Sequence, residues 1–134
     1  MTGADSQVVY ESAVTQVGGQ VEAFLGHGLL IFFGAQSPAE LHDMSVLHKA
    51  TVEEDGPQPG DLIQVGSTEL EVLAVGPVVR DNLLNLGHLD LKADGRTEPN
   101  LPGDVCVRVG DLPLLRAGDT FRITRPGTTR EQDT

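Results

Sequence analysis

Residues 102–109 read PGDVCVRV and residues 117–124 read AGDTFRIT, and this pattern decides the fold. In each stretch a Gly-Asp pair precedes apolar residues at every second position, the spacing of a strand with one buried face. A third Gly-Asp pair begins residues 60–65. Glycine permits a positive φ angle and aspartate can bond its own backbone, so each pair can turn the chain into a strand. The recurrence predicts a compact β-barrel or sandwich.

The rest of the chain also favours short strands over long helices. Its 16 Gly and 8 Pro residues divide 134 residues into short pieces. Further strand candidates are residues 8–17, 29–33, 69–75 and 88–92. We therefore predict a mainly β fold, a small β-barrel or sandwich of short antiparallel strands with one or two short helical turns. We expect one domain over residues 1–134, with an ordered core at about 8–125 and polar tails.

Two helical turns are expected between the strands. The letters SPAE that begin at Ser37 form a capping box, in which Ser37 is the N-cap and Glu40 bonds back to it. In the second turn Asp81 serves as the cap and Gly87 ends the helix. The tail at residues 126–134 is polar, and we expect it to fray.

Composition excludes several classes of function. The chain has 9 Lys and Arg against 20 Asp and Glu, a formal net charge of −11, which argues against nucleic acid and anionic membrane surfaces as partners. Cys106 is the single cysteine, so no intramolecular disulfide can form. Residues 1–7 lack the pattern of a signal peptide, and the longest apolar run, residues 29–33, is far too short to span a bilayer. We expect a soluble cytoplasmic protein without membrane insertion.

Histidines are the strongest candidates for chemistry, because a neutral imidazole nitrogen is a nucleophile near pH 7. On an extended segment His48 shares a face with Val46 and Ala50, where a histidine is more often packed than catalytic. His88 lies on a polar face with Asp90, where a surface histidine is the ordinary outcome. The pattern alone leaves both alternatives open.

Several short motifs occur in one order along the chain. They are Pro-Ala-Glu-Leu at 38–41 followed by His48, Val-Gly at 75–76, Asn-Leu at 82–83, Leu-Gly-His at 86–88, Asp-Gly at 94–95 and Pro-Gly at 102–103. Over about residues 9–124 this order resembles the glucitol/sorbitol-specific enzyme IIA component of the phosphoenolpyruvate-dependent sugar phosphotransferase system. The sequence departs from the family at Ala93, where an aromatic residue is usual, and at Lys49 and Ala50, which differ from some members.

The resemblance implies a phosphoryl-carrier protein with a small β-barrel-like fold and no cofactor. His48 would accept a phosphoryl group from phosphorylated HPr and pass it to the IIB component, which acts with the membrane component IIC. His88 would lie near His48 and orient it or bind the phosphoryl group. Asn82 and Lys49 are further candidates for contacts with the phosphoryl oxygens.

Other interpretations stay open beside this relay. The chain could be a non-catalytic regulatory or binding module of the same fold, or a structural β-domain with incidental histidines. His27 and His42 match no family motif, and the separation of His42 from His48 is not a metal-ligand spacing, so no metal site is expected. Cys106 lacks the sequence around the phosphocysteine of IIB and is interpreted as a packed bystander. The oligomeric state is left open, a homodimer included.

A partner surface is expected around His48. HPr must bring its phosphohistidine to His48, and docking surfaces are usually depleted of charge at their centre. We predict a shallow apolar patch from Val46, Leu47 and residues 41–44, rimmed by acidic residues. Docking of HPr there should be transient and sensitive to salt.

Overall fold

The structure, a computed structural model, describes residues 6–127, which form eight strands and three short helices. In chain order these are β1 (Gln7–Val17), α1 (Val21–Leu25), β2 (Leu29–Gly34), the 3₁₀-helix η2 (Ala39–Met44), β3 (Val46–Glu53), β4 (Leu62–Val65), β5 (Thr68–Val75), α2 (Val79–Leu86), β6 (Leu89–Lys92), β7 (Asp104–Val107) and β8 (Thr120–Arg125). Most of the two terminal stretches considered above, 1–7 and 126–134, lies outside the described residues. None of the helices within residues 6–127 is long and apolar enough to cross a bilayer.

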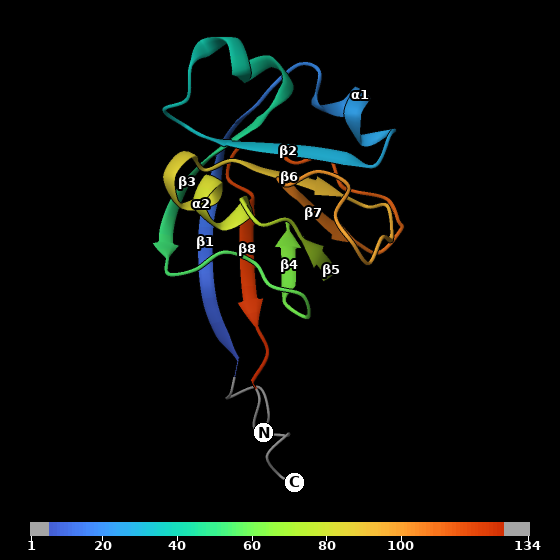
Figure 1. Ribbon diagram of the computed structural model, residues 1–134. Helices are drawn as coiled ribbons and strands as arrows, with labels where there is room; N and C mark the ends of the chain where they lie inside the picture. Colours follow the sequence, from blue (N-terminus) through green and yellow to red (C-terminus); the bar gives the residue numbers. More distant parts are fainter. Residues whose placement is uncertain (1–5, 128–134) are drawn as a thin grey trace, which may run out of the picture.

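The strands close into a barrel in the order β1-β3-β2-β6-β7-β5-β4-β8. β1 and β8 run side by side and complete the ring, while β2 and β6 cross above them in the view of Figure 1. The predicted mainly β fold is confirmed. Two pairs, β2 with β3 and β6 with β7, are parallel rather than antiparallel. Parallel neighbours need a long crossover, and the segments around η2 and between β6 and β7 supply it.

The three Gly-Asp pairs that precede predicted strands end in turns with the same two hydrogen bonds. Each aspartate accepts a hydrogen bond on its carboxylate from the backbone N–H three residues earlier and donates its own N–H to that residue's carbonyl. The pairs are Asp61 with Gln58, Asp104 with Leu101 and Asp119 with Arg116. Gly60 and Gly118 have φ angles of +94° and +96°, which only glycine adopts without strain. The predicted turn chemistry therefore begins β4, β7 and β8.

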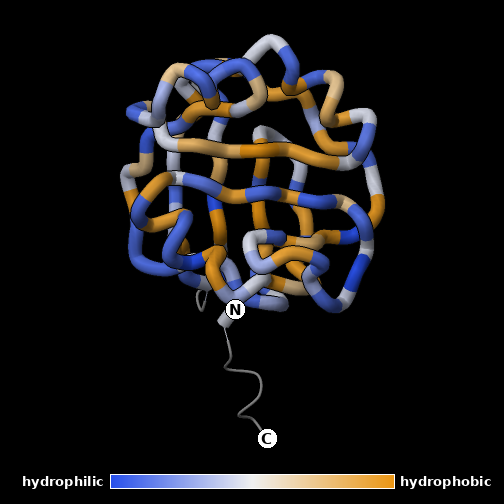
Figure 2. The backbone as a smooth tube through the Cα atoms, turned by 45° about the horizontal axis from the view of Figure 1, so that its top comes forward, coloured by the Kyte–Doolittle hydropathy of each residue, from blue (hydrophilic) through white to orange (hydrophobic). Residues whose placement is uncertain are grey.

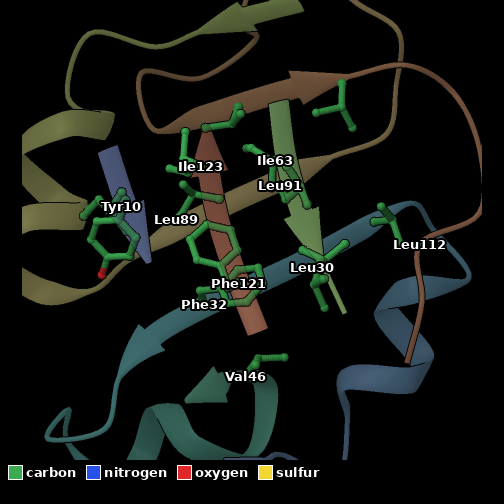
Figure 3. Packing of buried hydrophobic residues seen from close by; sticks show 14 of the residues in the cluster. Tyr10, Leu30, Phe32, Val46, Ile63, Leu89, Leu91, Leu112, Phe121 and Ile123 are labelled. Carbon is green, nitrogen blue, oxygen red and sulfur yellow. The ribbon is translucent and has the colours of Figure 1, made fainter. Parts of the chain in front are cut away.

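Apolar residues fill the inside of the barrel. Figure 3 shows the rings of Phe32 and Phe121 against each other at the centre, with centroids 4.5 Å apart, and the ring of Tyr10 at one side. Along several strands hydrophobic and hydrophilic residues alternate, and hydrophilic residues dominate the outer loops (Figure 2). β7 departs from the predicted alternation, because all four of its residues are buried. Its outer face lies against the connection from β6, where Cys106 meets Asp94.

The helices differ in part from the sequence prediction in where they begin. Ser37 does not cap η2: the helix begins at Ala39, Pro38 is extended at its N-cap, and no side chain caps it, so the capping box is wrong. α2 begins at Val79, with Asp81 in its first turn rather than at the cap. Gly87 does end α2, in the left-handed conformation. The sequence analysis missed α1, a single turn that buries only Val21.

Candidate functional site

His48 lies in β3, with its imidazole on the inside of the barrel. Only 2% of the residue is exposed. The rings of Phe32, Phe121 and Tyr10 surround the imidazole at centroid distances of 5.5, 5.7 and 6.1 Å. The sequence placed His48 on an apolar face, and the structure shows how deep that face lies. A polar ring at such a position needs hydrogen-bond partners, because an unpaired buried polar group is costly.

Both ring nitrogens of His48 have a partner. Nε2 lies 2.7 Å from the carbonyl oxygen of Gly87, and Nδ1 lies 2.7 Å from the hydroxyl of Ser12. A carbonyl can only accept, so Nε2 carries the proton and Nδ1 accepts from the Ser12 O–H. Burial lowers the pKa of His48 below its usual value of 6.5, and the Gly87 bond only partly opposes this. His48 is therefore a neutral imidazole in a defined tautomer at pH 7.

Residue 87 must be glycine for two reasons, its backbone conformation and its close approach to β2. Gly87 has a φ angle of +68°, the left-handed conformation that ends α2. A Cβ atom there would lie 2.6 Å from the backbone nitrogen of Gly34 and 3.3 Å from His48 Nε2. Any side chain would therefore push the end of α2 away from β2 and break its fit to the imidazole. This close approach explains the glycine of the Leu-Gly-His motif.

A cavity of 630 Å³ lies beside His48. Its wall combines strand residues with the loop after β2 and the end of α2. The lining residues are Tyr10, Phe33, Gly34, Ala35, Gln36, Ser37, Pro38, Leu41, His48, Lys49, Ala50, Glu53, Leu84, Asn85, Leu86 and Gly87. Gly87 lines the cavity and Ser12 does not, so the Nε2 edge of the imidazole faces the cavity and the Nδ1 edge faces the barrel interior.

Two residues with hydroxyl groups, Ser37 and Tyr10, line the cavity. Ser37 Oγ is buried and has no partner within the described part of the chain. The Tyr10 ring packs in the core, and its hydroxyl points away from the cluster in Figure 3. Burial, aided by the negative charge of Glu53, raises the pKa of Tyr10, so its hydroxyl stays a proton donor. The wall thus presents neutral donors beside His48.

His88 follows Gly87 directly, but its imidazole lies on the outer face of the barrel wall. It is stacked on Phe33 with centroids 4.1 Å apart, and its Nε2 lies 3.0 Å from Asp90 Oδ1. His88 does not line the cavity. The structure therefore brings His48 and His88 together through the Gly87 carbonyl and not by contact of their rings.

The two predicted oxygen donors are placed differently. Lys49 is exposed and lines the cavity, next to His48 on the strand. Asn82 lies inside α2, outside the cavity lining, and its carbonyl accepts the N–H groups of Gly87 and His88. Asn85, one helical turn later, lines the cavity instead. Asn82 therefore contributes to the Gly87 turn through its backbone and not through its side chain.

The predicted apolar patch around His48 is also corrected. Val46 and Leu47 are 0% and 2% exposed, because both faces of β3 are covered at that end. Of the apolar residues named for the patch, only Leu41 lines the cavity. The exposed apolar residue at its rim is Leu86, at 55% exposure.

Comparison with known proteins agrees with this arrangement. The sequence model of the "PTS system glucitol/sorbitol-specific IIA component" family matches residues 9–122. The chain belongs to this family. The glucitol/sorbitol-specific EIIA components of Shigella flexneri and Escherichia coli strain K12 are each 34% identical over 106 residues, which cover 79% of this chain and 85% of theirs. The crystal structure of a PTS system IIA component from Enterococcus faecalis V583 has the same fold, with a TM-score of 0.71 at 23% identity over 83% of this chain and 96% of that one.

The remaining candidates of this family member, Cys106, His42 and His27, do not line the cavity. Cys106 is fully buried, and burial together with the charge of Asp94 raises its pKa to about 11, so it is not a thiolate at neutral pH. His42 Nε2 lies 2.8 Å from the Ser37 carbonyl and braces the loop over the cavity. His27 is exposed. Within residues 6–127 no group of three or more acidic, histidine or cysteine side chains is arranged to hold a metal ion.

Sequence reasoning missed Ser12, Tyr10 and Asn85. The burial of Ser12 could have been predicted from the sequence. It follows Tyr10 by two residues on a strand rich in valine, so both side chains fall on the inward face. Nothing in the sequence pairs it with His48, because 36 residues separate them and the β1–β3 register shifts between Glu11 and Ser12.

Proposed function

We propose that this chain is the phosphoryl carrier of a glucitol/sorbitol phosphotransferase system. His48 accepts the phosphoryl group from phosphorylated HPr and passes it to the IIB component, which phosphorylates the sugar alcohol taken up through IIC. Membership of the IIA family supports a role in the phosphotransferase system, and the geometry of the site supports His48 as the acceptor. His88 contributes by positioning, since it fixes the peptide whose carbonyl holds His48.

The observation that carries this proposal is the state of the His48 imidazole. Both nitrogens are hydrogen-bonded at the wall of a cavity, and burial lowers the pKa, so the ring is neutral and oriented. Phosphoryl transfer depends on alignment of the nucleophile and on electrostatic support for the phosphoryl oxygens. Lys49 and the hydroxyls of Tyr10 and Ser37 are among the groups in the cavity wall that can give such support.

Phosphorylation by a reconstituted relay tests the proposal. The protein is incubated with enzyme I, HPr and ³²P-labelled phosphoenolpyruvate, and we expect an acid-labile, base-stable label that maps to His48. His48→Gln keeps a hydrogen-bonding amide in the same place and should abolish the label. His27→Gln, which replaces an exposed histidine outside the site, should be labelled like the natural protein. Full labelling of the His48 variant would refute the assignment.

A non-catalytic regulatory or binding module of the same fold is the second candidate. Its support is the 2% exposure of His48, with both nitrogens already bonded in this conformation. Such a module would bind HPr without becoming labelled. Chemical-shift mapping with HPr, run beside the labelling assay, separates the two functions, because only the carrier gives both binding and label.

A further inference from the structure

The two hydrogen bonds of His48 differ in which neutral tautomers of the imidazole they allow. The Gly87 carbonyl can only accept, so it is compatible with a proton on Nε2 and with no other neutral form. The Ser12 hydroxyl can donate to a bare Nδ1 or accept from a protonated one by rotating about its Cβ–Oγ bond. One side of the ring is therefore fixed, and the other side fits both tautomers.

Access to the ring is also unequal. Ser12 is 2% exposed and lies on β1 inside the barrel, so a partner protein cannot reach Nδ1 past it. Gly87 is half-buried, lines the cavity and follows Leu86, the exposed apolar residue at the rim. A partner that contacts Leu86 acts on the end of α2 and so on the Gly87 carbonyl. The nitrogen that can be uncovered is Nε2.

We propose that Ser12 is a positioning residue that holds His48 in either neutral tautomer, and that Nε2 is the nitrogen that is phosphorylated once the Gly87 carbonyl moves away. This inference rests on the proposed function. When the carbonyl moves away, water in the cavity takes the proton from Nε2 and gives a proton back to the ring at Nδ1, so the ring stays neutral and the water is unchanged. Nδ1–H then donates to Ser12 Oγ, and Nε2 has a free lone pair directed at the cavity.

The transfer step balances with this arrangement. The Nε2 lone pair attacks the phosphorus of a phosphohistidine on the donor protein, and a P–N bond forms as the donor's P–N bond breaks. The electron pair of the broken bond stays on the donor imidazole. Because that ring is protonated on its other nitrogen, it leaves as a neutral histidine. The positive charge passes to the His48 ring, whose Nδ1–H is held by Ser12, and this bond to a charged donor is stronger than a neutral one.

Histidine-labelled NMR with the full chain tests the inference. ¹⁵N shifts of the unphosphorylated protein should show His48 protonated on Nε2. After phosphorylation with enzyme I, HPr and phosphoenolpyruvate, ³¹P–¹⁵N coupling should place phosphorus on His48 Nε2. Ser12→Ala should slow the labelling about ten- to a hundred-fold, the loss usual when the partner that orients an imidazole is removed. In this variant the Nδ1–H signal of phosphorylated His48 should also shift, because its hydrogen-bond acceptor is gone.

Ser45→Ala is the matched control, because Ser45 is as buried as Ser12 but its hydroxyl donates to the Leu41 carbonyl instead of His48. Its His48 tautomer and phosphorylated nitrogen should match the natural protein. Phosphorus on His48 Nδ1, or unchanged labelling with an unchanged Nδ1–H signal in Ser12→Ala, would overturn this inference and leave the carrier function standing. Label on another residue, or no label, would overturn the proposed function and the inference with it.

Discussion

Two polar regions of this barrel are built in opposite ways. The histidine site, made of His48, Ser12 and Gly87, is uncharged and has a cavity beside it. The ionic cluster lies where β8 ends, and Arg125 is its centre. Arg125 bonds Asp61 through Nε and Nη2, Asp55 through Nη1 and the Gly56 carbonyl through Nη2, and Arg80 bonds the same Asp55.

The difference separates a region that stabilises the fold from a region that is suited to chemistry. In the ionic cluster each guanidinium nitrogen of Arg125 bonds at least one acceptor, so its polar groups tie β8, the loop before β4 and the start of α2 together. In the histidine site the imidazole is bonded, but the Ser37 hydroxyl in the cavity wall has no partner among residues 6–127 and can bind a group that enters the cavity. α2 connects the two regions, since Arg80 lies near its start and Gly87 at its end.

The largest expected effect comes from breaking the ionic cluster. Arg125→Met keeps the aliphatic stem but leaves Asp61, with a side chain only 3% exposed, without its cation. We expect the free energy of unfolding to fall by about 2–4 kcal/mol, as when one partner of a buried charged pair is removed. Urea denaturation measures this. Arg108→Met, which removes an exposed pair with Glu71, should cost less than about 1 kcal/mol; equal losses would contradict the comparison.

Gly87→Ala should damage the histidine site in both stability and labelling. The left-handed φ angle costs about 1–2 kcal/mol with a side chain, and the contact with Gly34 adds to it. Gly118→Ala is the matched control, since Gly118 also has a positive φ but no atom lies within 4 Å of its Cβ position. Gly87→Ala should be the less stable variant and the only one with slower phosphorylation of His48. Equal stability of the two would show that Gly87 is needed for its φ angle alone.

Acid should weaken the two regions in different pH ranges. Burial lowers the pKa of His48, so below pH 6.5 the unfolded chain takes up a proton before the folded one does. The free energy of unfolding should therefore fall as the pH drops below 6.5, and His48→Gln should remove this slope. Burial by itself raises the pKa of Asp55, but hydrogen bonds from Arg125 and Arg80 hold it at about 2.

The stability that Asp55 contributes is present above its usual pKa of 3.8 and is lost as the pH falls toward 2. Urea unfolding at a series of pH values, with His48→Gln and Asp55→Asn, assigns each slope to its region. A slope near pH 6 that persists in His48→Gln would count against the buried neutral imidazole.

The smallest effect is expected at His88. Its ring holds the Gly87 peptide from outside the barrel by stacking on Phe33 and bonding Asp90. His88→Ala should slow His48 phosphorylation about ten-fold, at the low end for loss of a residue that acts through another. The label should stay on His48. His27→Ala is the control for an exposed histidine, and labelling of His88→Ala at the natural rate would make His88 a surface residue without a role.

The sequence by itself determined the β architecture. Alternation of apolar residues and the Gly-Asp turns at Asp61, Asp104 and Asp119 act over a few residues, so local rules predict them well. Gly87 as a helix end was predictable for the same reason. The capping box at Ser37 failed because the crossover from β2 to β3 holds Pro38 extended at the N-cap, so the helix begins one residue later than the box requires.

Only the tertiary structure decided the environment of His48. Its two partners lie 36 and 39 residues away, on β1 and at the end of α2, and closure of the barrel with a register shift in β1 brings them to the ring. The sequence indicated histidines at 48 and 88 through local motifs. Alternation placed His48 on an apolar face and His88 on a polar one, but it could not name the groups that each ring contacts. Those depend on which strands become neighbours, and the free energy of burying side chains from the whole chain decides that.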